Sequence, residues 1–133
     1  MIYALVVEDD ADIRKLLVEQ LEDKGCVVRN AGNGAVGLRL LSKRKPDIIF
    51  VDIMMPVMDG IHFISKLKEN PETNDIPVVL VTAVNAPAET LRAVELGVKY
   101  RLAKPWEQKE LDFVFEQSLG LKLGKSDIST VRE

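Results

Sequence analysis

The sequence predicts an α/β protein whose doubly wound, five-stranded parallel sheet carries five helices. Short apolar runs alternate five times with amphipathic stretches of helical length, and this alternation is typical of a parallel sheet with helices on both faces. Most of the runs consist of consecutive apolar residues, which indicates strands that are buried on both faces. Five strand-then-helix units in 133 residues suit the flavodoxin-like strand order 2-1-3-4-5.

The first unit is a strand with an acidic end. Ile2–Val7 is apolar apart from one hydroxyl group and stops abruptly at Glu8-Asp9-Asp10. A helix is expected to begin near Asp10, because acidic side chains stabilise the N-terminal end of the helix dipole, and to end at Gly25. Its spacing places an apolar stripe toward the core and charged residues on the opposite face. The stripe comprises Ile13, Leu16, Leu17 and Leu21, and the outward residues are Arg14, Lys15, Glu19 and Glu22.

The second and third units bring a carboxylate to another strand end. Residues 26–28 predict a short second strand, and the apolar residues within 35–45 predict a helix. In Ile48–Asp52, four consecutive apolar residues end in an aspartate, which predicts a buried third strand. Asp59-Gly60 marks the loop beyond it, and a third helix is expected over residues 61–70.

In the fourth unit, a residue with a hydroxyl side chain follows the predicted strand. Ile76–Val81 is a run of apolar residues that predicts a fourth buried strand, and Thr82 follows it directly. A helix is expected over residues 87–97, because proline is favoured in the first helical turn and glycine after the last. Its spacing predicts that Leu91 and Val94 face the core.

The fifth unit places a cation at the last strand end. Residues 100–103 predict a short strand, and Lys104-Pro105 follows it immediately. A final helix is expected over residues 107–119. We therefore expect one domain over residues 1–119. Residues 120–133 mix Gly, Lys, Ser and Asp without periodicity, and we interpret them as a C-terminal tail or the start of a linker.

Composition excludes several classes of protein. The chain has 47% hydrophobic and 29% charged residues, as ordinary globular domains do. Its net charge of −3 gives no basic footprint for nucleic acid, so direct nucleic-acid binding is not expected. It lacks an apolar run long enough to cross a bilayer, so no membrane association is expected. The single cysteine, Cys26, excludes an internal disulfide and fits a cytoplasmic location.

The most specific signal is the set of residues at the strand ends. Glu8 and Asp9 follow the first strand, Asp52 ends the third, Thr82 follows the fourth and Lys104 follows the fifth. Parallel strands point the same way, so these side chains share the carboxyl edge of the sheet. Open α/β sheets bind their ligands at this edge.

The residue types at this edge favour phosphoryl chemistry. Three carboxylates in one place repel one another, and either a raised pKa or a divalent cation relieves the repulsion. An all-oxygen set without histidine or cysteine favours Mg²⁺ over Zn²⁺. With the cation and Lys104 neutralising phosphoryl oxygens and Thr82 donating a hydrogen bond, Asp52 is the candidate nucleophile.

At these residues the chain resembles the response-regulator receiver domains of two-component signalling systems. The resemblance covers about residues 2–119. It rests on four motifs, which are Val6-Val7-Glu8-Asp9-Asp10, Asp52-Ile53-Met54-Met55-Pro56-Val57-Met58-Asp59-Gly60, Thr82-Ala83 and Lys104-Pro105. It implies that Asp52 accepts a phosphoryl group. It also implies that Glu8, Asp9, Asp52 and the backbone carbonyl of Met54 hold Mg²⁺ together with water.

The resemblance also implies partners and a signalling role. The phosphoryl donor would be the phosphohistidine of a sensor histidine kinase or phosphotransfer protein. Lys104 would contact the phosphoryl oxygens, Thr82 would move toward them, and a cis bond often joins the residues at Lys104-Pro105. A downstream output domain or protein would receive the signal through the face formed by the fourth helix, fifth strand and fifth helix. Phosphorylation-dependent homodimerisation is a further expectation.

One position departs from the family pattern. The residue three before Lys104 usually carries an aromatic side chain that rotates on phosphorylation, but here it is Arg101. Tyr100 is adjacent and should point to the opposite face of the strand. Arg101 therefore calls into question the usual coupling between Thr82 and an aromatic residue. Two alternatives are a charge pair of Arg101 that changes with Thr82 and an output face that works through other contacts.

Two other classes of function fit these residues less well. A phosphatase with an aspartyl nucleophile would need a second acid two residues after Asp52, where Met54 stands, and a flavin site would be repelled by Glu8-Asp9-Asp10. The chain is therefore expected to catalyse only its own phosphorylation and dephosphorylation. The main alternative is a receiver-like interaction module that is not phosphorylated, although such a module would be expected to lose the acids, Asp52 or Lys104.

Overall fold

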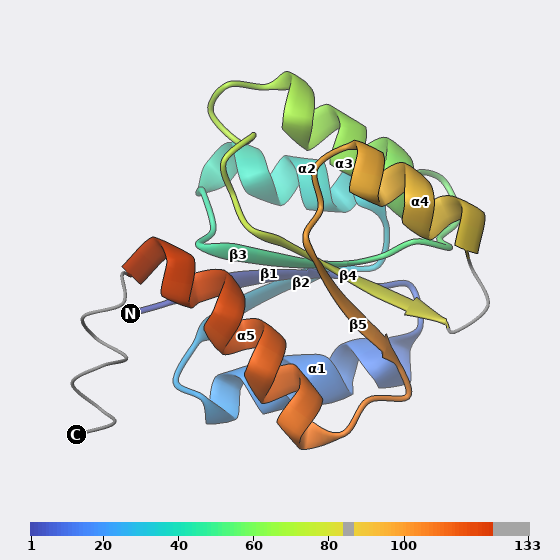
Figure 1. Cartoon of the computed structure of the whole chain (residues 1–133). Coiled ribbons are helices and arrows are strands. Elements are labelled where there is room, and N and C mark those ends of the chain that lie inside the picture. Colours follow the sequence, from blue (N-terminus) through green and yellow to red (C-terminus); the bar gives the residue numbers. More distant parts are fainter. Residues whose placement is uncertain (84–86, 124–133) are drawn as a thin grey trace.

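The computed structural model of the chain describes residues 1–83 and 87–123. It contains a single five-stranded parallel sheet with strand order β2-β1-β3-β4-β5, which confirms the predicted fold (Figure 1). The elements follow one another as β1 (Tyr3–Val7), α1 (Ala11–Asp23), β2 (Val27–Ala31), α2 (Gly34–Lys43), β3 (Ile48–Asp52), α3 (Gly60–Glu69), β4 (Val78–Ala83), α4 (Pro87–Glu95), β5 (Tyr100–Lys104) and α5 (Gln108–Leu123).

The helices cover both faces of the sheet. Helices α1 and α5 lie on one face, and α2, α3 and α4 lie on the other (Figure 1). Because side chains alternate along a strand, β1 contributes Ala4 and Val6 to the core beneath α1 and α5. The same strand contributes Leu5 and Val7 to the core beneath α2, α3 and α4. The consecutive apolar runs of the sequence therefore fill two hydrophobic cores.

Strands β1 and β3 form the centre of the sheet. They pair in parallel from Ala4–Ile48 to Val7–Val51, so their carboxyl ends lie side by side. All five residues of each strand are buried. At the edges, β2 has one buried residue, Ala31, and β5 has one, Leu102. Asp52 therefore lies at the carboxyl end of the most deeply buried part of the sheet.

Polar caps begin three of the helices. The side chain of Asp10 accepts hydrogen bonds from the backbone N–H groups of residues 12 and 13 at the start of α1. Asn33 caps α2 through the N–H of residue 36, and Asp59 caps α3 through that of residue 62. Each cap satisfies a donor that has no partner within its helix. Gly25 follows α1 with a φ of 92°, as the sequence predicted.

Several element boundaries differ from the prediction. Strand β2 runs to Ala31 rather than residue 28, because it pairs with all five residues of β1. Strand β5 includes Lys104 itself. Helix α5 continues to Leu123, four residues past the expected end. The proposed division between a domain over residues 1–119 and a tail stays a prediction, and residues 124–133 lie outside the described part of the chain.

The expected burial of three leucine and valine side chains was wrong. Leu91 and Val94 are 60% and 58% exposed, and Leu16 is 45% exposed. Ala93 is the one buried residue of helix α4, and it belongs to the core beneath α2, α3 and α4. In α1, Leu17 is buried, although Leu16 was expected to be buried beside it. Helical spacing identifies candidate stripes, but the rotation of a helix about its axis depends on the elements that it meets.

The helices of the described residues are also informative about membranes. None of them combines the length and the apolar character that a bilayer-spanning helix needs.

Candidate functional site

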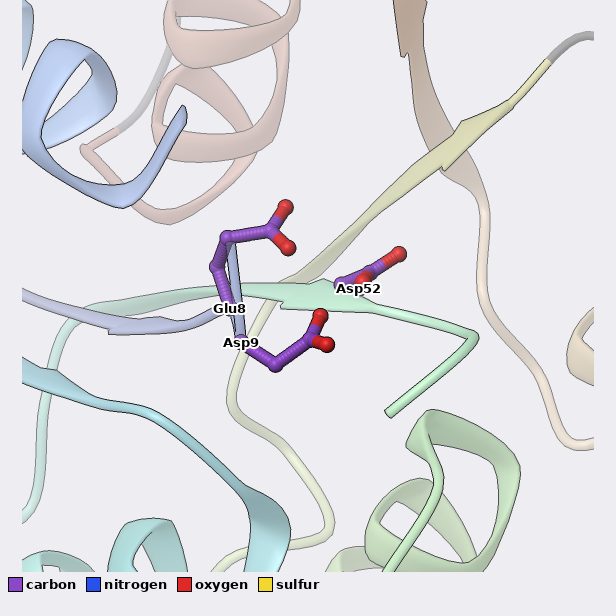
Figure 2. Close-up of side chains that lie close together, drawn as sticks. All are labelled: Glu8, Asp9 and Asp52. Carbon is purple, nitrogen blue, oxygen red and sulfur yellow. The ribbon is translucent and has the colours of Figure 1, made fainter. Parts of the chain in front are cut away.

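Three carboxylates meet at the carboxyl edge of the sheet. Glu8 and Asp9 follow β1, and Asp52 is the last residue of β3. Each offers one oxygen atom, and these oxygen atoms all lie within 4.8 Å of one another. Figure 2 shows the three side chains extending from the adjacent ends of the two strands. The predicted juxtaposition of these acids is therefore present.

A backbone hydrogen bond joins Glu8 to the neighbouring strand. The N–H of Glu8 donates to the carbonyl of Ala31 at 3.0 Å, so the turn after β1 is attached to β2. Glu8 and Asp52 are 1% and 5% exposed, whereas Asp9 is exposed. The site therefore combines two buried carboxylates with a third that faces solvent.

Gly60 closes the loop behind Asp52. Its N–H donates to the carbonyl of Ile53 at 2.8 Å. A Cβ atom on Gly60 would lie only 2.2 Å from the backbone carbonyl oxygen of Asp52. The close approach requires glycine, since any side chain would displace either the loop or the strand end. The sequence marked Asp59-Gly60 as a loop and as the end of a motif, but it did not indicate this contact, because a tertiary contact leaves no periodic pattern.

Lys104 brings a cation to the carboxylates from β5. Its Nζ lies 2.8 Å from Oε1 of Glu8 and 3.4 Å from Oδ1 of Asp52. Among the described residues, however, the buried Oε1 of Glu8 has no hydrogen-bond donor. The 2.8 Å ion pair with Lys104 is thus the contact that compensates this buried oxygen. The peptide bond between Lys104 and Pro105 is cis.

Burial and crowding alter the proton affinities of this cluster. Burial is the main reason why the pKa of Asp52 rises from 3.8 to about 7, and the neighbouring Glu8 carboxylate raises it further. The Lys104 ammonium partly opposes this effect. Burial would lower the pKa of Lys104, but Glu8 and Asp52 outweigh it, so the pKa of Lys104 is raised and the side chain stays charged.

The donor set fits a hard divalent cation. Glu8, Asp9 and Asp52 are the one such cluster of potential ligands within the described residues, and all of their ligand atoms are oxygen. Three carboxylates carry more negative charge than one Lys104 ammonium neutralises, and that ammonium is the only cation in contact with Oε1 of Glu8 among the described residues. Carboxylate oxygens with access to solvent, which Asp9 provides, suit Mg²⁺ because it retains several water ligands.

The structure also places the other residues singled out from the sequence. Thr82 is buried in β4, and its hydroxyl donates to the carbonyl of Ala83 at 3.0 Å. Met54 lies two residues beyond Asp52 with its side chain 64% exposed, and the role of its carbonyl stays a prediction. Arg101 is exposed, whereas Tyr100 packs into the core beneath α1 and α5. The two side chains thus lie on opposite faces of β5, as expected.

One residue near the site was assigned incorrectly from the sequence. Arg14 was expected to face solvent with Lys15, but it is half-buried. Its Nη1 donates to the backbone carbonyl of Glu8 at 2.8 Å. Helical spacing could not indicate this contact, because a long polar side chain reaches around the helix to whatever acceptor the fold presents.

Comparisons with known proteins agree with this geometry. Residues 4–115 match the model of the response regulator receiver domain family. The phosphate regulon transcriptional regulatory protein PhoB of Escherichia coli K12 is 38% identical over 107 residues, which are 80% of this chain and 47% of PhoB. An uncharacterised 14.6 kDa protein of Leptolyngbya boryana is 35% identical over 113 residues, which are 85% of this chain and 86% of that protein.

Solved structures show the same similarity. The chemotaxis protein CheY4 of Vibrio cholerae superimposes with a TM-score of 0.84 at 27% identity, covering 90% of this chain and 99% of CheY4. The chain spans about half the length of PhoB and 86% of the Leptolyngbya protein. The similar proteins therefore include both longer chains and chains of comparable size.

Proposed function

This chain belongs to the response regulator receiver domain family, and from that premise we propose that it is a phosphorylation-activated switch whose acceptor is Asp52. The observation that carries the proposal is the cluster of Glu8, Asp9 and Asp52 with the Lys104 ammonium beside it. The proposal assigns the phosphohistidine of a sensor histidine kinase or phosphotransfer protein as the donor. On this proposal the chain catalyses only its own phosphorylation and dephosphorylation.

Asp52 is suited to act as the nucleophile. It is buried at the end of β3, and its pKa of about 7 leaves a substantial ionised fraction near neutral pH. In the proposed step, an ionised oxygen of Asp52 forms a bond to phosphorus while the bond between phosphorus and the donor imidazole nitrogen breaks. The electron pair of that bond stays on the imidazole, and Asp52 becomes an acyl phosphate.

The surrounding residues have complementary roles in this proposal. Glu8, Asp9, Asp52 and the backbone carbonyl of Met54 would hold Mg²⁺. Bound Mg²⁺ would supply positive charge to the crowded carboxylates and to the phosphoryl oxygens. The Lys104 ammonium, 3.4 Å from Asp52, is within reach of an oxygen of a phosphoryl group placed there.

Thr82 and the face beside it would transmit the change. The hydroxyl of Thr82 donates to Ala83 in this structure and would turn toward the phosphoryl group. The proposed signalling surface is the face of α4, β5 and α5, where Arg101 and the apolar Leu91, Val94 and Phe113 are exposed. Amide chemical shifts that stay unchanged over residues 91–119 on activation would argue against this surface.

The longer relatives suggest what the switch controls. PhoB is a transcriptional regulatory protein about twice as long as the matching region. We therefore propose that the signal passes to an output domain or protein, and that nucleic-acid contacts belong to that partner. A cytoplasmic location and a homodimer that forms on phosphorylation belong to the same proposal.

Intact mass spectrometry tests the proposed acceptor. The chain is incubated with phosphoramidate, with and without Mg²⁺, alongside Asp52→Ala and the matched control Asp12→Ala. Asp12 is an exposed acid in the first turn of α1, outside the carboxylate cluster. We expect one Mg²⁺-dependent phosphoryl adduct in the native chain and in Asp12→Ala, and none in Asp52→Ala.

The opposite result would favour the other candidate. If calorimetry shows that Mg²⁺ binds but no adduct forms, the chain is a receiver-like interaction module that is not phosphorylated. An adduct that persists in Asp52→Ala would contradict the assignment of Asp52 while leaving phosphorylation itself in place.

A further inference from the structure

We propose that Arg14 is a positioning residue that holds the acidic turn after β1 in the geometry that binds Mg²⁺. The inference rests on the proposed function, because it concerns the same cation site. It assigns to this chain a cation-positioning contact between a side chain of α1 and the backbone of Glu8. Arg14 does not touch the carboxylates in this role and acts on them through the turn.

The first observation is that Arg14 contacts both ends of the turn, the start through its side chain and the end through its backbone. Its Nη1 donates to the backbone carbonyl of Glu8 at 2.8 Å, where the turn begins. Its own backbone N–H donates to the carbonyl of Asp10 at 2.9 Å, where the turn becomes helix α1. The segment that carries Glu8 and Asp9 is therefore held by one residue of the helix that follows it.

The second observation is that Glu8 is fixed from both sides. Its N–H donates to Ala31 of β2, and its carbonyl accepts from Arg14. One oxygen of its side chain, Oε2, accepts from the N–H of Asp10 at 3.2 Å. Without Arg14, the carbonyl of the peptide group between Glu8 and Asp9 would lose this hydrogen bond, and only the preceding peptide group, through the N–H of Glu8, would remain bonded to β2. Rotation of the peptide group between Glu8 and Asp9 would redirect both carboxylates at once.

The third observation is the space that the guanidinium occupies. A Cβ atom on Gly32, in the loop after β2, would lie 3.4 Å from Nη1 of Arg14. The guanidinium thus lies between this loop and the turn after β1, and the side chain is half-buried. Lys15, the next residue, is exposed and carries the same charge, so it provides a matched control.

Electrostatics and positioning predict effects of opposite sign. If Arg14 acted only through its charge, its removal would lessen repulsion of a cation and Mg²⁺ would bind more tightly. If Arg14 positions the turn, its removal lets Glu8 and Asp9 leave the binding geometry and Mg²⁺ binds more weakly. Losing a residue that orients metal ligands typically lowers metal affinity about tenfold or more.

The test compares Mg²⁺ dissociation constants measured by calorimetry for the native chain, Arg14→Met and Lys15→Met. Methionine keeps a long apolar stem at both positions but removes the charge and the donors. We expect about tenfold weaker binding in Arg14→Met, and equal or slightly tighter binding in Lys15→Met. The phosphorylation rate of Arg14→Met should approach the native rate at saturating Mg²⁺, because positioning affects affinity more than the chemical step.

A second variant covers the case in which Arg14→Met does not fold. Arg14→Gln keeps a polar group in the half-buried position but is too short to span the distance that the guanidinium spans, so weaker Mg²⁺ binding is expected again. Binding by either folded variant that equals or exceeds that of Lys15→Met would overturn the inference. Failure of the native chain to bind Mg²⁺ would instead overturn the proposed function.

Discussion

The centre of the sheet and its β5 edge differ in how tightly they are packed. At the centre, β1 and β3 are buried along their whole length, and α3 buries five of its ten residues. At the edge, β5 has one buried residue, and α4 has only Ala93. We call the first group, β1, β3 and α3, the site half, and the second group, α4 and β5, the α4–β5 half.

The difference in packing matches the different roles proposed for the two halves, which are phosphoryl acceptance and signalling. Carboxylates within 4.8 Å of one another repel, so their positions require a closely packed support. A helix held through one small buried residue can change its position at little cost, because few contacts are lost. The proposed acceptor therefore lies in the site half, and the proposed signalling surface lies in the α4–β5 half.

The largest expected effect is a loss of stability, and a pair of substitutions, one in each half, tests the difference in packing. Phe63 of α3 is completely buried, with its ring against the position of Gly37, whereas Leu91 of α4 is 60% exposed. We expect Phe63→Ala to lower the free energy of unfolding by about 3–5 kcal/mol. Leu91→Ala should change it by about 0.5 kcal/mol or less. Urea denaturation measures both values, and similar losses would contradict the distinction between the two halves.

The second prediction concerns how the carboxyl group of Asp52 makes the stability of the chain depend on pH. Without divalent cations, the pKa of Asp52 is about 7 in the folded chain against an ordinary 3.8. Between these values the folded chain retains a proton that the unfolded chain has released, so stability falls as pH rises from about 4 to 7. Asp52→Asn should lose this dependence and should be more stable than the native chain at pH 8.

Asp112 provides a control, because its pKa shifts in the opposite direction to that of Asp52. Its pKa is lowered, chiefly by the hydrogen bond from Lys24 and also by Gln108. The contribution of this group is present above its ordinary pKa and is lost as pH falls through the lowered value. In Asp112→Asn, the decline of stability between pH 4 and 7 should therefore remain. Denaturant titrations at several pH values measure these effects, and a native chain whose stability is constant over that range would refute the role given to Asp52.

The smallest expected effect concerns backbone strain. Val57, in the loop after β3, has a φ of 69° and is 83% exposed. The left-handed region costs a non-glycine residue about 1–2 kcal/mol, but asparagine tolerates it better than a β-branched residue does. We expect Val57→Asn to raise the free energy of unfolding by about 0.5–1 kcal/mol. Val94→Asn, on the exposed face of α4, should lower it by a few tenths, and a loss at both positions would argue against strain at Val57.

Local patterns in the sequence were sufficient for the architecture and for most of the site. Consecutive apolar residues predicted β1, β3 and β4, because burial on both faces leaves no place for polar side chains along a strand. The alternation with helices then required a parallel sheet. The meeting of Glu8, Asp9, Asp52 and Lys104 followed from this direction together with the strand order 2-1-3-4-5, since parallel strands bring their ends to one edge and this order makes the strands concerned contiguous.

Tertiary structure decided what depends on the approach of separate elements. The rotation of α4, which buries Ala93 and exposes Leu91, depends on its packing against α3 and the core. The need for glycine at position 60 arises where α3 meets the end of β3, and the inward reach of Arg14 arises where α1 meets the turn after β1. A residue sequence determines which side chains avoid water, but the partners of a helix face or a long side chain exist only after the chain has folded.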